Sequence, residues 1–144
     1  MLVKQILSQK SVTGIETIAP DSAVSDAARQ LAQRRIGALI VSRDGMGVDG
    51  ILSERDIVRE LGSRGADCMR DRVHEVMTRR VQSCEPGDSS ETVLAQMTAG
   101  RFRHMPVVEA GRMVGVISIG DVVKARMSQI ETEKHALEDM IRGF

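Results

Sequence analysis

Two short segments of the chain carry a serine followed three positions later by an aspartate. The segments are GILSERDIV at residues 50–58 and GVISIGDVV at residues 115–123, and the pairs are Ser53 with Asp56 and Ser118 with Asp121. A helix that begins at such a serine presents free N–H groups and the positive end of its dipole, which favour a phosphate. The serine hydroxyl can donate to that phosphate, and an ionised aspartate can accept hydrogen bonds from both hydroxyls of a ribose. The pattern therefore suits a ribose phosphate.

The same spacing is also found at ordinary helix starts. A serine at the N-cap with an acidic residue three positions later forms a capping box, which satisfies backbone N–H groups without a ligand. Duplication does not separate the two interpretations, because caps are duplicated together with their helices. The sequence has no cluster of carboxylates, histidines or cysteines with metal-ligand spacing, and His104 has no orienting acid beside it. We therefore expect neither catalytic residues nor a metal site.

Composition narrows the class of protein. The 144 residues carry 20 basic and 20 acidic side chains, without the clustered basic excess of a nucleic-acid-binding protein. Phe102 and Phe144 are the only aromatic residues, which disfavours the stacking of bases on aromatic platforms. No apolar run approaches the roughly 20 residues that cross a bilayer, and the N-terminal segment is too interrupted for a signal peptide. Cys68 and Cys84 form no CxxC pair and indicate reduced thiols, so we expect a cytoplasmic protein without nucleic-acid or membrane partners.

The two Ser-x-x-Asp segments belong to a tandem repeat. Pro20 matches Pro86 at an offset of 66, and from Gly50 and Gly115 onward the offset is 65. The lost residue falls in a glycine-rich stretch of the kind that joins two strands. Apolar spacing in each copy predicts the order strand, helix, strand, strand, helix. The sequence therefore predicts a mixed α/β (α+β) fold of two similar modules.

We expect the modules to span residues 1–66 and 67–126, with a helical extension over 127–144. A module of about 60 residues is marginally stable alone, because small domains bury too little of their surface. We therefore expect the two copies to pack their sheets together around a pseudo-twofold axis and to share a core. Such packing leaves paired clefts between the modules, where ligands bind.

Several motifs together resemble a known family. The motif G-h-h-S-x-x-D (h is an apolar residue) closes a strand-strand-helix unit, follows a P-D-x-x-h helix and an I-G-A-L or R-H-M-P strand, and recurs in the same order. This arrangement resembles the cystathionine-β-synthase (CBS) domain in tandem, from Val3 to about Arg126. CBS pairs are regulatory modules that bind adenosine-containing ligands between their halves, which implies AMP, NAD or ATP here, with S-adenosylmethionine as a further candidate.

The resemblance also implies which residues bind. Ser53 and Asp56 would meet phosphate and ribose in one site, and Ser118 and Asp121 in the other. Backbone near the central strands would contact adenine, and the segment before each proline would close over the base. These last two groups are Ile36, Gly37, Ala38, Arg103, His104, Met105 and Pro106, and Thr17, Ile18, Ser83 and Cys84.

Two departures from the family pattern affect these expectations. The first copy has Ile40 where the family commonly has proline in the strand, which affects the adenine contact. Glu54 and Arg55 in the first motif are replaced by Ile119 and Gly120 in the second. Arg55 either neutralises a phosphate or is a solvated residue at the helix start. The different linings suggest different ligands in the two sites, for instance AMP in one and a dinucleotide such as NAD in the other.

The last predicted helix continues past the second module. Its apolar residues recur with a seven-residue period that is broken by Lys134, and they are Val123, Met127, Ile130, Leu137 and Ile141. Burying this stripe between subunits favours a homodimer, and a helix folded back on its own module is the alternative. We expect a ligand sensor without an attached enzyme domain, signalling to a partner protein through its conformation or its dimer. The alternatives are a small metal-dependent nucleotide hydrolase that uses Asp56 or Asp121, and a purely structural dimer.

Overall fold

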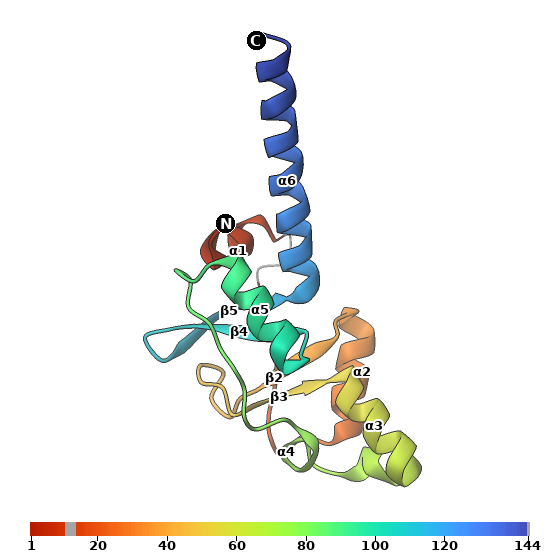
Figure 1. The fold of residues 1–144 in the computed structure, drawn as a ribbon. Coiled ribbons are helices and arrows are strands. Elements are labelled where there is room, and N and C mark those ends of the chain that lie inside the picture. Colours follow the sequence, from red (N-terminus) through yellow and green to blue (C-terminus); the bar gives the residue numbers. More distant parts are fainter. Residues whose placement is uncertain (11–13, 144) are drawn as a thin grey trace.

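The computed structural model describes residues 1–10 and 14–143, and contains two small sheets with helices around them and one long helix at the C-terminal end (Figure 1). The first part of the chain forms α1 (Val3–Gln9), β1 (Thr17–Ile18), α2 (Val24–Arg34), β2 (Ala38–Val41), β3 (Gly50–Ser53), α3 (Glu54–Arg64) and the 3-10 helix η1 (Gly65–Arg70). The second part forms α4 (Val73–Val76), α5 (Ser90–Gly100), β4 (His104–Glu109), β5 (Arg112–Ser118) and α6 (Ile119–Ile141). The predicted mixed fold of two repeated modules is confirmed.

The first sheet has the order β1-β2-β3. Strands β1 and β2 run parallel, whereas β2 and β3 form an antiparallel pair in which Ala38 lies opposite Ser53. In the second module β4 and β5 pair antiparallel, with His104 opposite Ser118. The counterpart of β1 is reduced there to a single parallel bridge between Cys84 and Val107. Equivalent pairing therefore places the two serines of the repeated motif at equivalent strand ends.

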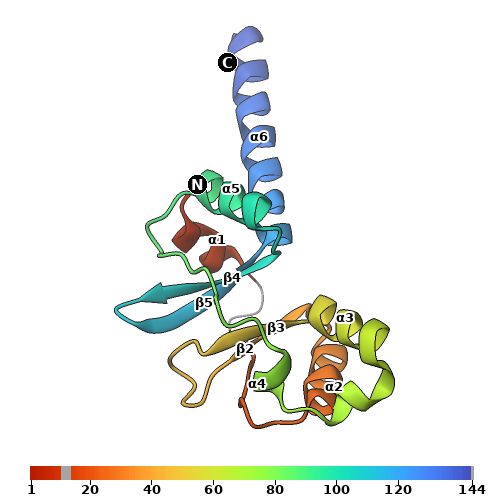
Figure 2. The ribbon, with the colours of Figure 1, turned by 60° about the horizontal axis from the view of Figure 1, so that its bottom comes forward.

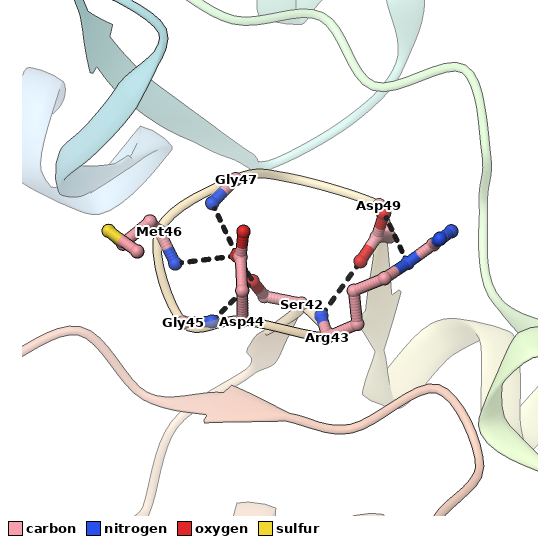
Figure 3. A network of polar contacts seen from close by, with 7 residues as sticks. All are labelled: Ser42, Arg43, Asp44, Gly45, Met46, Gly47 and Asp49. Atoms are coloured by element: carbon pink, nitrogen blue, oxygen red, sulfur yellow. Dashed lines mark hydrogen bonds and ion pairs between the residues drawn. The ribbon is translucent and has the colours of Figure 1, made fainter.

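The loop between β2 and β3 is held by its own side chains (Figure 3). One carboxylate oxygen of Asp44 accepts hydrogen bonds from the backbone N–H groups of Met46 and Gly47, both at 2.9 Å. These bonds, first that from Gly47, lower the pKa of the Asp44 carboxyl below its usual value. The carbonyl of Met46 in turn accepts from the N–H of Met113 at 2.9 Å, so this loop of the first module contacts β5 of the second.

The buried apolar side chains form two clusters instead of the single shared core that the sequence suggested. One contains Leu39, Val41 and Leu52 of the first sheet, and the other contains Met105, Val107 and Ile117 of the second. Because side chains alternate along a strand, Ile40 points to the opposite face of its sheet from Leu39, and it is only 1% exposed there. In Figure 2 these opposite faces of the two sheets are turned toward each other.

The packing of helix α1 crosses the boundary between the sequence modules. Its apolar residues Val3 and Ile6 are buried in the second core, whereas Val73 of α4 is buried in the first. The exchange is symmetric, because the backbone before α1 pairs with Ser89 and the backbone before α4 pairs with Ala23. Each module therefore depends on a helix that precedes the other module in the sequence.

The motif glycines allow the exchanged helices to approach. A Cβ atom on Gly50 would lie 2.5 Å from Sδ of Met77 and 2.9 Å from the carbonyl oxygen of Thr78. A Cβ atom on Gly115 would lie 2.8 Å from a methyl carbon of Leu7. A side chain at either position would overlap the segment that follows α4 or the end of α1. The glycines thus serve packing between segments of the chain.

Helix α6 has two parts with different surroundings. Val122 and Ala125 in its first turns are buried against the second core, but its C-terminal half projects beyond the rest of the chain (Figures 1 and 2). The residues of the predicted apolar stripe are exposed. They are Val123, Met127, Ile130, Leu137 and Ile141. Among residues 1–10 and 14–143, no helix has the length and apolar character required to span a membrane.

Candidate functional site: two clefts between the modules

Both Ser-x-x-Asp motifs form helix caps in this structure. The Oγ atom of Ser53 accepts from the N–H of Asp56 at 3.2 Å, and Oδ2 of Asp56 accepts from the N–H of Ser53 at 2.9 Å. Ser118 and Asp121 repeat these contacts at 3.1 and 2.9 Å. The capping interpretation is therefore realised in the fold, and each cap uses only the Oδ2 atom of its carboxylate.

A cleft of about 290 Å³ opens at the start of α3, and is called the first cleft below. The first motif contributes Ser53, Glu54, Arg55 and Asp56, and β4 with its preceding residues contributes Arg103 and His104. Asp56 is only 6% exposed, and its Oδ1 atom lies 3.4 Å from Nη1 of Arg59, a further lining residue. Residues predicted from both modules are thus brought together around one buried carboxylate.

The second cleft has a volume of about 800 Å³ and lies on the other side of the contact between the modules. Of the predicted residues it includes Ile36, Gly37 and Ala38 from the first module and His104 and Ser118 from the second. Val114 and Val116 of β5 add apolar surface. The two clefts share Gly37 and His104, which lie where the modules meet.

Asp121 does not line the second cleft, whereas its counterpart Asp56 lines the first. Its Oδ2 atom lies 2.8 Å from Nζ of Lys10, which also donates to the carbonyl of Val116 at 2.8 Å. Burial raises the pKa of the Asp121 carboxyl, but the hydrogen bond from Lys10 and those from Ser118 outweigh burial, so the pKa is lowered. Asp121 instead lines a separate pocket, together with Lys124. The two sites are therefore asymmetric.

Several predicted residues lie outside both clefts. Ile18, Cys84 and Met105 are buried in the cores. The segment before each proline does line a cleft, but with residues two positions before the predicted ones. Val81 and Gln82 line the first cleft, and Ile15 and Glu16 line the second. The remaining predicted residues that line neither cleft are Thr17, Ser83, Pro106, Ile119 and Gly120. A ligand contact for these residues stays a prediction.

Most of the charged lining residues that sequence reasoning missed are arginines. Arg59, Arg80 and Arg101 line the first cleft, and Lys10, Arg34 and Arg35 line the second. Two of these arginines could have been found from the repeat, because Arg35 and Arg101 occupy equivalent positions directly after α2 and α5. Both have the left-handed backbone that commonly ends a helix. Arg80 could not be found in this way, since it lies in a connecting segment without regular structure.

The imidazole of His104 lies against Gly37. A Cβ atom on Gly37 would lie 3.0 Å from Cε1 and 3.2 Å from Nε2 of His104, and 3.7 Å from Oε1 of Glu54. Burial lowers the pKa of His104 below its usual value, and it outweighs the opposite effects of the Glu54 and Asp121 carboxylates. The neutral imidazole is therefore favoured in the fold.

We expect the protein to lose stability as the pH falls below about 6.5, the ordinary pKa of histidine. The unfolded chain binds a proton at His104 more readily than the folded chain does, so acid favours unfolding. His104→Gln should flatten the pH dependence of the free energy of unfolding between pH 7.5 and 5, measured by urea denaturation. His135→Gln, on the exposed part of α6, should leave the slope unchanged. Equal slopes in the wild type and His104→Gln would contradict this assignment.

Neither the cysteines nor the acidic residues of the described chain form a metal site. Cys68 and Cys84 are free and buried, and burial raises the pKa of the Cys84 thiol to about 11. No group of three or more histidine, cysteine or carboxylate side chains that could hold a metal ion is found in residues 1–10 and 14–143.

Fold and clefts together define a pair of small modules related by a pseudo-twofold axis, and comparison with known proteins identifies the family. The sequence model of the CBS domain matches residues 3–63 and 73–128. The chain therefore belongs to the CBS domain family and contains a tandem CBS pair.

Individual relatives agree with this assignment. The chain is 32% identical over 127 residues to the mitochondrial CBS domain-containing protein CBSX3 of Arabidopsis thaliana, covering 85% of this chain and 62% of that protein. The crystal structure of a CBS-domain-containing protein of Agrobacterium tumefaciens matches with a TM-score of 0.83 and 41% identity, over 88% of this chain and 99% of that one. The CBS domain pair of protein MJ0100, solved with 5′-methylthioadenosine and S-adenosyl-L-methionine, matches with a TM-score of 0.77 and 24% identity, over 90% of this chain and 98% of that one.

Proposed function

We propose that this CBS pair is a regulatory module that binds adenosine-containing ligands, such as AMP, NAD or ATP, in the clefts between its two halves. The observation that carries the proposal is the position of Asp56. Its carboxylate is almost fully buried, it lies in the first turn of α3, and it lines a cleft whose other wall comes from the second module. A ribose hydroxyl can donate to Oδ1 of Asp56, which here faces Arg59 at 3.4 Å.

The shared fold supports the chemical class of ligand. The MJ0100 pair, which shares the fold, holds two adenosyl compounds. The larger second cleft has room for a bigger ligand than the first, which supports a dinucleotide such as NAD as its ligand. S-adenosylmethionine remains a further candidate.

Signalling follows from the arrangement of the clefts. A ligand in either cleft contacts both modules, and it therefore favours one relative arrangement of them over others. Because α1 and α4 are each buried in the other module, a change between the modules also reaches the N-terminal helix. We propose that a partner protein, or a second copy of the chain, detects this change.

The proposal is tested by titration calorimetry of the full chain with AMP, ATP and NAD, followed by chromatography of the recovered ligand. We expect saturable binding of at least one compound and recovery of the ligand unchanged. Failure of all three compounds to bind would contradict the proposed class of ligand. Conversion of a bound nucleotide would favour the metal-dependent hydrolase instead of the regulatory module.

We also propose that the protein forms a homodimer through the exposed apolar stripe of α6 and the exposed apolar residues of α3. Val58 and Leu61 of α3 are 66% and 37% exposed, and Val123, the counterpart of Val58, is 44% exposed. Met127, Ile130 and Leu137 continue the apolar surface along α6, each more than half exposed. Burying these side chains against a second copy removes apolar surface from water, at about 25 cal/mol per Å².

A further inference from the structure

The first cleft is lined by an unusual number of cations. Arg55 and Arg59 come from the first turns of α3, Arg80 from the segment after α4, and Arg101 and Arg103 from the residues before β4. Against these five arginines stand two lining carboxylates, Glu54 and Asp56. The arginines come from three separate segments, so their convergence is a property of the fold.

Four of these arginines have no acidic partner within the part of the chain that the structure describes. Arg59 faces Asp56 at 3.4 Å, but no ion pair within 4.0 Å joins Arg55, Arg80, Arg101 or Arg103 to a described carboxylate. Like charges held around one cleft repel one another, and this repulsion is relieved when an anion enters. Guanidinium groups also match phosphate oxygens with two parallel hydrogen bonds.

The pseudo-twofold repeat supplies an internal comparison. Arg55 corresponds to Gly120 and Arg103 corresponds to Gly37, so the equivalent positions of the second site carry no charge. The cations that do line the second cleft are partly neutralised, since Lys10 lies 2.8 Å from Asp121 and Arg34 lies 3.5 Å from Glu16. Excess positive charge is therefore concentrated in the first cleft.

We propose that the first cleft is specific for a nucleoside di- or triphosphate, whose phosphate chain is bound by Arg55 and Arg103 with Arg80 and Arg101 around them. This assignment rests on the proposed function, because Asp56 would hold the ribose of the same ligand. The N-terminus of α3 would receive the phosphate nearest the sugar, and the exposed arginines would bind the outer phosphates. A monophosphate or a free nucleoside would leave most of the arginines without an anion.

The test compares ATP, AMP and adenosine by titration calorimetry without divalent cations, using the full chain at low and high salt. We expect ATP to bind at least tenfold more tightly than AMP at low salt, and the preference to shrink as salt screens the charges. The double variant Arg55→Gln/Arg103→Gln should lower the affinity for ATP by roughly 100-fold, a factor of ten for each lost charge-assisted contact. The affinity for adenosine should change by less than about twofold.

The matched control is the double variant Arg70→Gln/Arg112→Gln. It removes the same two charges from exposed positions that line neither cleft, and it should bind ATP as the wild type does. If ATP, AMP and adenosine all fail to bind, the polyphosphate assignment is overturned, and if NAD fails to bind as well, the proposed function fails with it. If AMP binds as tightly as ATP, or if the control loses as much affinity as the cleft variant, only the polyphosphate assignment is overturned. An equal loss for ATP and adenosine would overturn it as well.

Discussion

Asp56→Asn removes the ligand-dependent rise in stability while the chain remains folded. At a ligand concentration 100 times the dissociation constant, binding stabilises the native state by about 2.7 kcal/mol. An asparagine oxygen can still accept the hydrogen bond from the N–H of Ser53 that closes the cap, but its NH₂ group cannot accept a bond from a ribose hydroxyl. The loss of the contact with Arg59 and of the ionised cap costs about 1 kcal/mol of stability without ligand.

The measurement is thermal unfolding of wild type and variant with and without AMP or ATP. Ser89→Ala is the matched control, because Ser89 caps α5 through the N–H of Thr92 at 3.1 Å and lines neither cleft. We expect Ser89→Ala to lower the melting temperature and to keep the full ligand response. If Asp56→Asn kept the same response as the control, the motif would be a cap alone, and the ribose assignment would be wrong.

Ile130→Glu converts the proposed dimer into a monomer. Ile130 is 55% exposed in the single chain, so the change leaves the fold of the chain intact. In a dimer, however, a glutamate there would place a charge within an apolar interface, at a cost of several kcal/mol unless a partner neutralises it. Dissociation should therefore rise by a factor of 100 or more, since each 1.4 kcal/mol changes the dissociation constant tenfold.

Sedimentation velocity at micromolar concentration measures this change. Thr132→Glu adds the same charge two residues away on the same helix, outside the apolar stripe, and should remain a dimer. A wild-type protein that sediments as a monomer would contradict the proposed dimer. Equal dissociation of both variants would show that charge on α6, not burial of the stripe, controls assembly.

Much of the fold could be predicted because its main signals are local. Capping residues, apolar spacing and turn glycines fix the helices and strands, and the repeat applies each inference twice. The start of α3 directly after Ser53 and the start of α6 directly after Ser118 follow from such signals. The exchange of α1 and α4 could not be predicted, because Val3 and Ile6 give the same apolar pattern whichever core they enter.

The asymmetry of the two sites also depends on contacts that a repeat cannot reveal. Ser118 and Asp121 match Ser53 and Asp56 in type and spacing, but Lys10, from a segment more than 100 residues away, contacts the Asp121 carboxylate. The burial of Ile18 and Cys84 could not be predicted either. The sequence does not distinguish residues that line a cleft from the buried residues that directly follow them. The asymmetry of the sites and the burial of these residues therefore depend on contacts between distant segments, which local sequence patterns do not specify.

The central claim is that adenosine-containing ligands bind between the modules with the sugar on Asp56. A crystal structure of the full chain with ATP or AMP tests it most directly. We predict electron density for the nucleotide in the first cleft, with ribose hydroxyls within hydrogen-bond distance of the Asp56 carboxylate and phosphate beside the start of α3. Empty clefts at saturating nucleotide, or a nucleotide bound away from Asp56, would contradict the account.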